Sequence, residues 1–484
     1  MTISTPRRSV TWRPDRAIHR FSTYRHLHRL LIPFLAIWAT GFILLIRQQY
    51  YIPTPEYIGC TASPWDNWPP DVCGINATDC ATDLVTASYR CPGACRDVTL
   101  GNPRWVGGEQ VNGVPFVVGG NSDTYRADSW ICPAAIHANM ISPRFGGCVT
   151  VDAIPFLQGA SGFLNSTSNG ITSSSFLPHF PGAFTLTSHS QTGCIDLHAY
   201  ISTYNALCLA IFTLFLQPST GVLYSVLMVL GYAQIKLVSN PPTMMPDWSA
   251  IAGDLPAVLG AVYWIWHVAF KRTLKGFKHL PLETTLWQGL GYWIGVESST
   301  IFAKLPISRL GYDPLDPAGV ITLTIIVVLV VIVVVVQVWD MRKYGTVWYY
   351  LIRYLPLVPI VILLATLPGY YFRPHHYLLS LLALPVLSLP NRVSLFLQAF
   401  FLGLFLDGVG RWGWDSIIET KAALLGDADA GTGTPTFDLV NSTASLLSWD
   451  GGSDVGDSTG SGVGVMIDDV LREWDLMTNS ESSE

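Results

Sequence analysis

Cysteine is the residue type whose spacing says most about chemistry in this 484-residue chain. Eight of its nine cysteines fall between residues 60 and 194, and an even number in one compact segment indicates four disulfides. The pair in Cys91-Pro-Gly-Ala-Cys95 also has the spacing of zinc ligands, which leaves a metal site as the alternative. Cys208 lies in an apolar run and is interpreted as a small apolar filler. The disulfide candidates are Cys60, Cys73, Cys80, Cys91, Cys95, Cys132, Cys148 and Cys194.

Three histidines stand where they could act as ligands or proton carriers. His375 and His376 are adjacent, so on a helix their side chains point about 100° apart and do not easily share one metal. Haem would need axial histidines on facing helices, and no such arrangement is visible. His137 follows small apolar residues and has no suitably spaced acid or nucleophile, so we expect it to hydrogen-bond its helix to a sheet. We predict no catalytic residue, metal or cofactor.

Charged residues inside or beside apolar runs form a second set of candidates. Glu297 lies within an apolar segment, where an acid is a functional hypothesis by default. Asp407 and Arg411 are four residues apart, as are Arg411 and Asp415. Because residues at this spacing share a helix face, we expect both acids to pair with the arginine as a structural clamp.

Long apolar runs supply the elements that must position these residues. A membrane-spanning helix needs about 20 apolar residues, and only 13% of this chain is charged, about half the share in soluble proteins. The β-branched run 320–338 is too long for one strand and is expected to be a helix in lipid. Segments 284–302, which contains Glu297, and 376–389, which is short and contains Pro385, are doubtful spans. The nine expected spans are 30–46, 199–216, 221–238, 250–269, 284–302, 318–338, 348–368, 376–389 and 392–410.

Positive charge predicts the orientation of these spans. The arm 1–29 is rich in arginine, and the first span is followed by Arg47-Gln48-Gln49 rather than by the small residues of a cleavage site. We therefore expect a retained signal-anchor with the arm in the cytosol. Lysine and arginine are more frequent on the cytosolic flanks of the later spans, which predicts nine crossings and a C-terminus on the side opposite the arm.

Residues 47–197 contain no span and are rich in Gly, Pro, Ser, Asn and Cys, so we expect a folded domain outside the membrane. Glycosylation sequons occur there at Asn76 and Asn165, and a third at Asn441 follows the last span. Residues 198–415 form the multipass region. The tail 416–484 is acidic and expected to be largely flexible. Its two candidates for ordered structure are 437–449 and 464–474; the second fits a helix or a strand, and we expect a small β element.

Within the cysteine-rich domain, Tyr89-Arg-Cys-Pro-Gly-Ala-Cys95 is followed by Tyr125-Arg-Ala-Asp-Ser-Trp-Ile-Cys-Pro-Ala-Ala-Ile-His137 and by Gly146-Gly147. This order resembles the LCCL domain, with its core at about residues 80–155. Together with the basic arm, the single preceding span, Arg373-Pro-His-His-Tyr377 and Arg411-Trp-Gly-Trp414, the chain resembles the fungal multipass LCCL proteins.

The resemblance implies disulfides Cys80–Cys91 and Cys95–Cys132, which leave Cys60–Cys73 and Cys148–Cys194 by elimination. It also implies a lipopolysaccharide-like, carbohydrate or lipid ligand. Asn139 stands where the family usually has glycine, and asparagine is the next-best residue for a left-handed helix end. For the helix before it we expect Asp128 or Ser129 as the N-cap. Its buried residues should be Ile131, Ala134, Ala135 and Ala138.

The expected fold class is a multipass α-helical membrane protein of about nine spans, with a disulfide-rich α+β LCCL domain between spans 1 and 2. The expected function is binding of a glycan or lipid on the lumenal or extracellular side. A transporter or lipid-handling protein with an accessory LCCL domain is the alternative. An enzyme has least support, because the sequence has no nucleotide-binding loop and no Gly-x-Ser-x-Gly. A formal charge of −6 gives no reason to expect nucleic acid. The expected location is an integral membrane of the secretory pathway, the vacuole or the plasma membrane.

Overall fold

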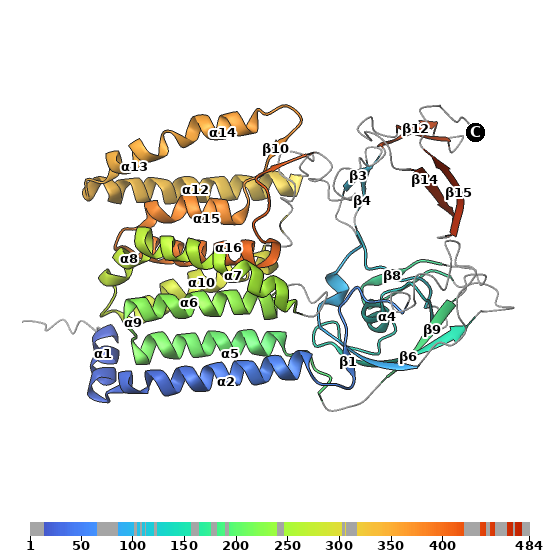
Figure 1. Ribbon diagram of the computed structural model, residues 1–484, viewed down its shortest axis with the longest axis horizontal. Helices are drawn as coiled ribbons and strands as arrows, with labels where there is room; N and C mark the ends of the chain where they lie inside the picture. The colour runs from blue at the N-terminus through green and yellow to red at the C-terminus, as the bar shows by residue number, and fades with distance from the viewer. Residues whose placement is uncertain are drawn as a thin grey trace, which may run out of the picture.

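The structure is a computed structural model that describes residues 14–64, 86–100, 104–106, 109–111, 113–120, 123–155, 164–175, 182–188, 193–239, 246–302, 305, 317–420, 436–441, 446–450, 462–467 and 470–476. Figure 1 shows helices lying side by side in one bundle, with a sheet-containing domain at one end of it. The domain is inserted between helices α2 (Leu31–Tyr50) and α5 (His198–Ile211), as expected from the position of the cysteines.

Seven helices of the described chain are long and apolar enough to cross a membrane, and they indicate an integral membrane protein. They coincide with seven of the nine expected spans. The two doubtful segments, 284–302 and 376–389, do not reach this length. The seven helices are Leu27–Tyr50, His198–Leu216, Thr220–Ser239, Trp248–Gly276, Pro317–Lys343, Val347–Ala365 and Arg392–Trp412.

Several of these helices contain more than one helical type. After α1 (Pro14–Tyr24) and η1 (Leu27–Leu30), the chain forms α2 and later α5 with the π-helical η4 (Phe212–Leu216). The next helices are α6 (Thr220–Gln234) with η5 (Ile235–Ser239), and α7 (Trp248–Ile265) with η6 (Trp266–Phe270) and α8 (Lys271–Gly276). Then follow α9 (Pro281–Glu283), η7 (Thr284–Gln288), α10 (Gly289–Val296) and α11 (Ser298–Ile301). The last helices are α12 (Pro317–Lys343), α13 (Val347–Tyr354), α14 (Leu357–Ala365), α15 (His376–Ala383), η8 (Leu384–Leu387) and α16 (Arg392–Trp412).

Both doubtful segments lie along α16, which is the most buried long helix. Arg392 Nε donates to Glu283 Oε2 (2.8 Å) at one end of α16, and Ser298 Oγ donates to Asp407 Oδ2 (2.8 Å) near the other. The run from α9 to α11 therefore accompanies α16 for most of its length. The α15–η8 segment runs antiparallel, because His376 lies beside Gly408 whereas the carbonyl of Leu387 accepts from Gln398 Nε2 (2.8 Å).

Glycine permits the close approach of α10 and α16. A Cβ atom added at Gly295 would lie 2.1 Å from the carbonyl oxygen of Phe400, and one added at Gly403 would lie 2.5 Å from the backbone nitrogen of Val296. Helix pairs in membranes associate through such small residues, since lipid provides no hydrophobic driving force between helices. A side chain at either position would force the two helices apart.

The cysteine-rich domain is built on a five-stranded sheet of order β1-β2-β6-β9-β5. The strands are β1 (Glu56–Tyr57), β2 (Ala87–Cys91), β6 (Gly147–Pro155), β9 (Gly182–Ser188) and β5 (Thr124–Arg126). Only the β1–β2 pair is parallel. Helix α4 (Ile131–His137) packs into the same core as Val149 and Phe184 of the sheet. Short additional elements are η3 (Cys95–Asp97), β3 (Arg104–Val106), β4 (Glu109–Val111), β7 (Ser166–Ser168) and β8 (Ile171–Ser173).

The acidic tail contains two β-hairpins within its described residues. Strand β12 (Thr436–Asn441) pairs with β13 (Leu446–Asp450), and β14 (Gly462–Ile467) pairs with β15 (Val470–Leu476). These strands occupy both segments that the sequence singled out as candidates for order, and the second is a β element, as predicted, rather than the helix that was the alternative. A further small pair, β10 (Tyr371–Phe372) with β11 (Ile418–Glu419), joins the chain before α15 to the chain after α16.

Candidate functional site

Helix α4 carries His137 in the core of the cysteine-rich domain. His137 is buried, with its Nδ1 2.8 Å from the hydroxyl of Tyr125 and its Nε2 3.2 Å from the hydroxyl of Ser166. The expected hydrogen bond to the sheet is therefore present, since Tyr125 belongs to β5. Burial lowers the pKa of His137, although a backbone hydrogen bond at Ser166 opposes the shift. The neutral imidazole links α4 to strand β5 and to the β7–β8 hairpin, so His137 has a structural role.

The ends of α4 differ partly from expectation. Asn139 has a positive φ of 60°, so it makes the expected left-handed turn. The N-cap prediction is wrong, because Trp130 occupies that position and no side chain caps the helix. Asp128 is instead paired with Arg126 at 2.7 Å, and Ser129 Oγ accepts from the N–H of Val118 at 3.0 Å. The expected buried residues Ile131, Ala134 and Ala135 are fully enclosed, and Ala138 is partly buried.

The disulfides correct most of the expected pairing. Cys60 is joined to Cys95 and Cys91 to Cys132, so the pairs Cys95–Cys132, Cys80–Cys91 and Cys60–Cys73 are wrong. Strand β2 and helix η3 place Cys91, rather than Cys95, beside the start of α4. Cys148–Cys194 is present as expected. Cys73 and Cys80 lie outside the described residues. Because Cys91 and Cys95 are both in disulfides, the zinc alternative is wrong for this pair.

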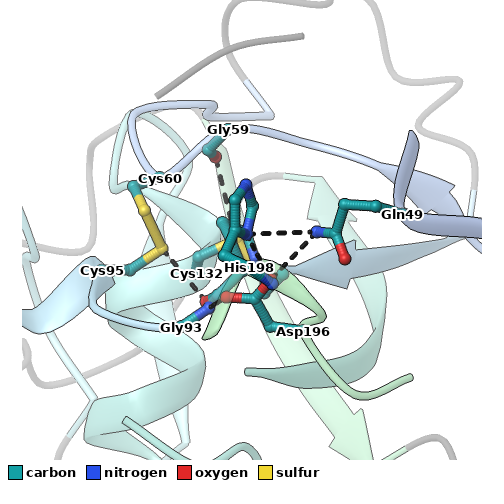
Figure 2. Close-up of a disulfide and its surroundings, with 10 residues drawn as sticks. Gln49, Gly59, Cys60, Gly93, Cys95, Cys132, Asp196 and His198 are labelled. Atoms are coloured by element: carbon teal, nitrogen blue, oxygen red, sulfur yellow. Dashed lines mark hydrogen bonds and ion pairs between the residues drawn. A yellow bond between two sulfur atoms is a disulfide. The ribbon is translucent and has the colours of Figure 1, made fainter. Parts of the chain in front are cut away.

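A hydrogen-bond network around Asp196 fixes the domain to the bundle (Figure 2). One carboxylate oxygen of Asp196 accepts from the N–H of Gly93 (2.8 Å), and the other accepts from Gln49 Nε2 (3.0 Å) and from the His198 ring. Gln49 Oε1 accepts in turn from the N–H of Leu197 (2.8 Å). Because Gln49 lies in the last turn of α2, Gly93 belongs to the domain and His198 begins α5, one buried carboxylate connects all three.

Electrostatics favours the ionised form of Asp196. Burial alone would raise the pKa of this carboxyl, but the hydrogen bond and charge of His198 and the N–H groups of Gly93 and His198 outweigh burial and leave the pKa below its usual value. His198 Nε2 lies 2.7 Å from the hydroxyl of Tyr50, so both ring nitrogens face oxygen atoms. The network is thus held by charge as well as by geometry.

Arg90 makes a second connection between the domain and α2. Its guanidinium donates to the backbone carbonyls of Gln48 (3.0 Å) and Gln49 (2.5 Å) at the end of that helix. A cation at a helix C-terminus stabilises the otherwise unpaired carbonyl groups. Burial lowers the pKa of Arg90, whereas the nearby Tyr57 and Asp196 raise it.

A polar layer lies inside the bundle around Glu297. Glu297 Oε1 accepts from Ser239 Oγ (2.6 Å) and from Gln234 Nε2 (3.3 Å). Gln234 is fully buried, and its Oε1 accepts from Asn205 Nδ2 (2.9 Å), whose own Oδ1 accepts from the indole N–H of Trp38 (2.9 Å). The chain of bonds crosses from α2 through α5 and α6 to the residue after α10. No cation pairs with Glu297 in the described part of the chain, so its partners are neutral.

The expected clamp on α16 is half correct. Arg411 Nε donates to Asp407 Oδ1 (2.8 Å), and Asp407 also accepts from Ser298 Oγ (2.8 Å) and from Ser299. The pairing of Arg411 with Asp415 is wrong, because α16 ends at Trp412 and Gly413 turns the chain with φ of 69°. Arg411 instead donates to the backbone carbonyl of Ser239, which links the clamp to the polar layer around Glu297.

The adjacent histidines do not converge on a common ligand. His375 Nε2 lies 2.7 Å from the carbonyl of Ser416, whereas the His376 ring contacts Trp412 edge-on. Among the residues that the structure describes, no group of His, Cys, Asp or Glu is placed to hold a metal.

The glycosylation candidates are distributed over both parts of the chain. Asn165 is exposed immediately before β7. Asn441 ends β12, and Asn76 lies outside the described residues.

Sequence reasoning missed the residues that join the domain to the bundle. Gln49 and Arg90 carry no local signature, and Asp196 is an ordinary polar residue before a span. Asn205 and Gln234 did carry a signal, because amides inside apolar runs commonly hydrogen-bond between membrane helices.

Comparison with known proteins finds an LCCL domain at residues 65–181, a wider range than the expected core. The chain is also 29% identical over 467 residues to the uncharacterized protein YIL067C of Saccharomyces cerevisiae. That match covers 87% of this chain and 67% of the yeast protein. No solved structure matches the chain. Helix α4, His137 and the disulfide Cys91–Cys132 thus lie within the LCCL domain. The disulfide Cys60–Cys95 joins the domain to the sequence just before it.

Proposed function

We propose that this protein binds a glycan or lipid through its LCCL domain on the non-cytosolic side of a membrane, and that the helix bundle responds to the bound state. The observation that carries the proposal is the docking of the domain. Asp196 and Arg90 bind it to the ends of α2 and α5 through buried, charge-assisted hydrogen bonds. Such bonds are stronger than neutral ones, so a change in the domain would reach two membrane helices directly.

The proposed topology has nine crossings, with the arm in the cytosol and the LCCL domain and tail on the other side. It is supported by the contacts of the two short segments with α16. The segment between Glu283 and Ser298 accompanies α16 from Arg392 to Asp407, and α15–η8 returns along the same helix. Both segments therefore cover most of the depth of a helix that is long enough to span.

The test is a glycan and lipid array probed with the fluorescently labelled full-length chain in nanodiscs. We expect retention of one glycan or lipid class, and loss of that retention after reduction of the disulfides. Empty nanodiscs are the control. Signals equal to those of empty nanodiscs across the array would contradict the proposal.

A second candidate function, transport or lipid handling, is favoured by the polar layer around Glu297. A carboxylate is costly within a membrane and is a functional hypothesis by default, and in the described part of the chain Glu297 has only neutral partners. Its hydrogen-bond partners come from α6 and η5, which pack in the same bundle core.

Lipid scrambling in proteoliposomes tests this second function. Glu297→Gln should abolish scrambling, whereas Glu283→Gln should preserve it, because Glu283 lies at the opposite end of α16, paired with Arg392. Equal rates in parent and Glu297→Gln proteoliposomes would exclude this role for the carboxylate.

A further inference from the structure

An apolar groove opens on the side of the bundle between α7 and α15. It is lined by Ala257, Ala261 and Trp264 of α7, by Leu381 of α15 and by Trp414 after α16, and its volume is about 490 Å³. Sites for small molecules commonly have volumes of about 300–1,000 Å³. Ala257 and Ala261 are four residues apart, so they lie on one helix face and their small side chains leave the space open.

The two sequence motifs that were not explained by the LCCL domain hold one residue of the groove wall, Trp414, in place. The Tyr377 hydroxyl donates to the carbonyl of Asp415 (2.6 Å), and its ring contacts Trp414 edge-on at 5.3 Å. His375 stacks on Tyr377 at 5.8 Å and bonds to the carbonyl of Ser416. The segments 371–377 and 411–419 thus hold the indole of Trp414 in a fixed position beside Phe405.

The surroundings of the groove indicate which molecule reaches it. Leu259 and Tyr263 of the same helix are 54% and 69% exposed, as expected for side chains that face lipid. Trp264 and Trp414 are 43% and 39% exposed, and neither indole N–H donates to an acceptor within the described residues. At a membrane–water interface, tryptophan commonly keeps its ring in apolar surroundings and its N–H at a polar group. Trp414 follows the end of the membrane helix α16.

We propose that the groove binds one acyl chain of a membrane phospholipid, with the indole N–H of Trp414, which follows the end of α16, available to the oxygen atoms of its ester or headgroup. The lining offers no charge and almost no polar atom to any other ligand. The proposal rests on the lipid-handling function above, and it concerns occupancy of a site rather than movement of lipid. A resident lipid here would contact α7, α15 and the segment that follows α16.

Photocrosslinking tests the proposal with the full-length chain in nanodiscs that contain a phosphatidylcholine bearing a diazirine in its acyl chain. We expect labelling of the peptides around 257–264 and 412–416 well above that of α12, whose apolar side chains are mostly exposed to lipid. Ala261→Trp, and the smaller change Ala257→Leu, fill the groove and should reduce the labelling to the level of α12. Ala252→Trp on the exposed part of α7 is the matched control and should leave it unchanged.

Two results would overturn the proposal. One is labelling of α7 no greater than that of α12 in the parent, which indicates ordinary boundary lipid. The other is labelling that persists in both groove-filling variants. Because scrambling is measured separately, a labelled groove with no scrambling would support the lipid site and contradict only the transport function.

Discussion

Replacing Asp196 with alanine tests the docking of the LCCL domain on the bundle. The Asp196 carboxylate accepts from the N–H of Gly93 (2.8 Å) and from Gln49 Nε2 (3.0 Å), and both donors lie in buried surroundings. Alanine removes the acceptor of the N–H groups of Gly93 and His198 and leaves Gln49 Nε2 only its 3.4 Å contact with His198 Nδ1. Each buried unpaired donor costs about 1–3 kcal/mol. The docked state should therefore lose roughly 2–6 kcal/mol, which is about a 30-fold or larger increase in the equilibrium constant for undocking.

Hydrogen exchange of the intact chain in nanodiscs measures this change, since amides protected by docking exchange in proportion to the local opening equilibrium. We expect faster exchange at residues 90–93 and 196–198, with α10 and α16 unaffected. Asp152→Ala is the matched control, because this half-buried aspartate of β6 makes its hydrogen bond to Thr185 through its backbone carbonyl. Unchanged exchange at 90–93 and 196–198 in Asp196→Ala would refute the reasoning.

The lowered pKa of Asp196 adds a pH dependence to the same experiment. A carboxyl whose pKa is lowered by folding contributes stability above its unfolded pKa of about 3.9 and loses it as the pH falls through the folded value. The docking should therefore weaken below about pH 4 in the parent. In Asp196→Ala this part of the pH dependence should be absent.

Three further predictions follow from the domain and the topology. Peptide mapping of the non-reduced protein should find Cys91 joined to Cys132, and a Cys95–Cys132 peptide would contradict this pairing. Cys132→Ser should lower the free energy of unfolding by about 4 kcal/mol in the loop-entropy model, for a sequence separation of 41. His137→Gln can keep a hydrogen bond and should melt above His137→Leu, which leaves a partner unsatisfied at about 1–3 kcal/mol. Because burial lowers the pKa of His137, the parent should lose stability as the pH falls below about 6.5, and this loss should be smaller in His137→Gln. Glycosidase treatment should shift the electrophoretic mobility of the parent more than that of Asn441→Gln. An equal shift in both would argue against a lumenal tail.

The membrane helices were largely predictable because a continuous apolar run of about 20 residues has few other stable structures. The β-branched segment 320–338 forms α12, as the length argument required. Hydropathy alone could not predict how the two doubtful segments pack, because it contains no information on contacts between helices. The first fits against α16 through Gly295 and the polar pairs at Glu283 and Ser298. The second fits through the approach of His376 to Gly408 and the bond from Gln398 to the carbonyl of Leu387.

The disulfide pairing shows why spacing alone was insufficient. Cys91 and Cys95 are four residues apart, and either could reach α4 by its distance along the chain. Strand β2 ends at Cys91 beside the helix, while η3 turns Cys95 toward Cys60. The direction of the backbone after residue 91 decides which of the two cysteines reaches Cys132, and that direction depends on how the chain packs.

The candidate sites were predictable where a residue was unusual for its surroundings. Glu297 was found because an acid is rare in a membrane segment. Arg90 and Asp196 were not found, because arginine in a strand and aspartate before a helix are common. Their importance arises only when the chain brings α2, α5 and the domain together.

Binding of a ligand to the LCCL domain should change the helix bundle through the docking contacts of Asp196 and Arg90. The most direct measurement is hydrogen exchange of the full-length chain in nanodiscs, with and without the glycan or lipid that binds best on the array. We expect altered exchange in the LCCL domain, at residues 90–93 and 196–198, and around Gln234 and Glu297, with the last change lost in Asp196→Ala. Exchange altered only within the domain, with the bundle unchanged in the parent, would contradict it.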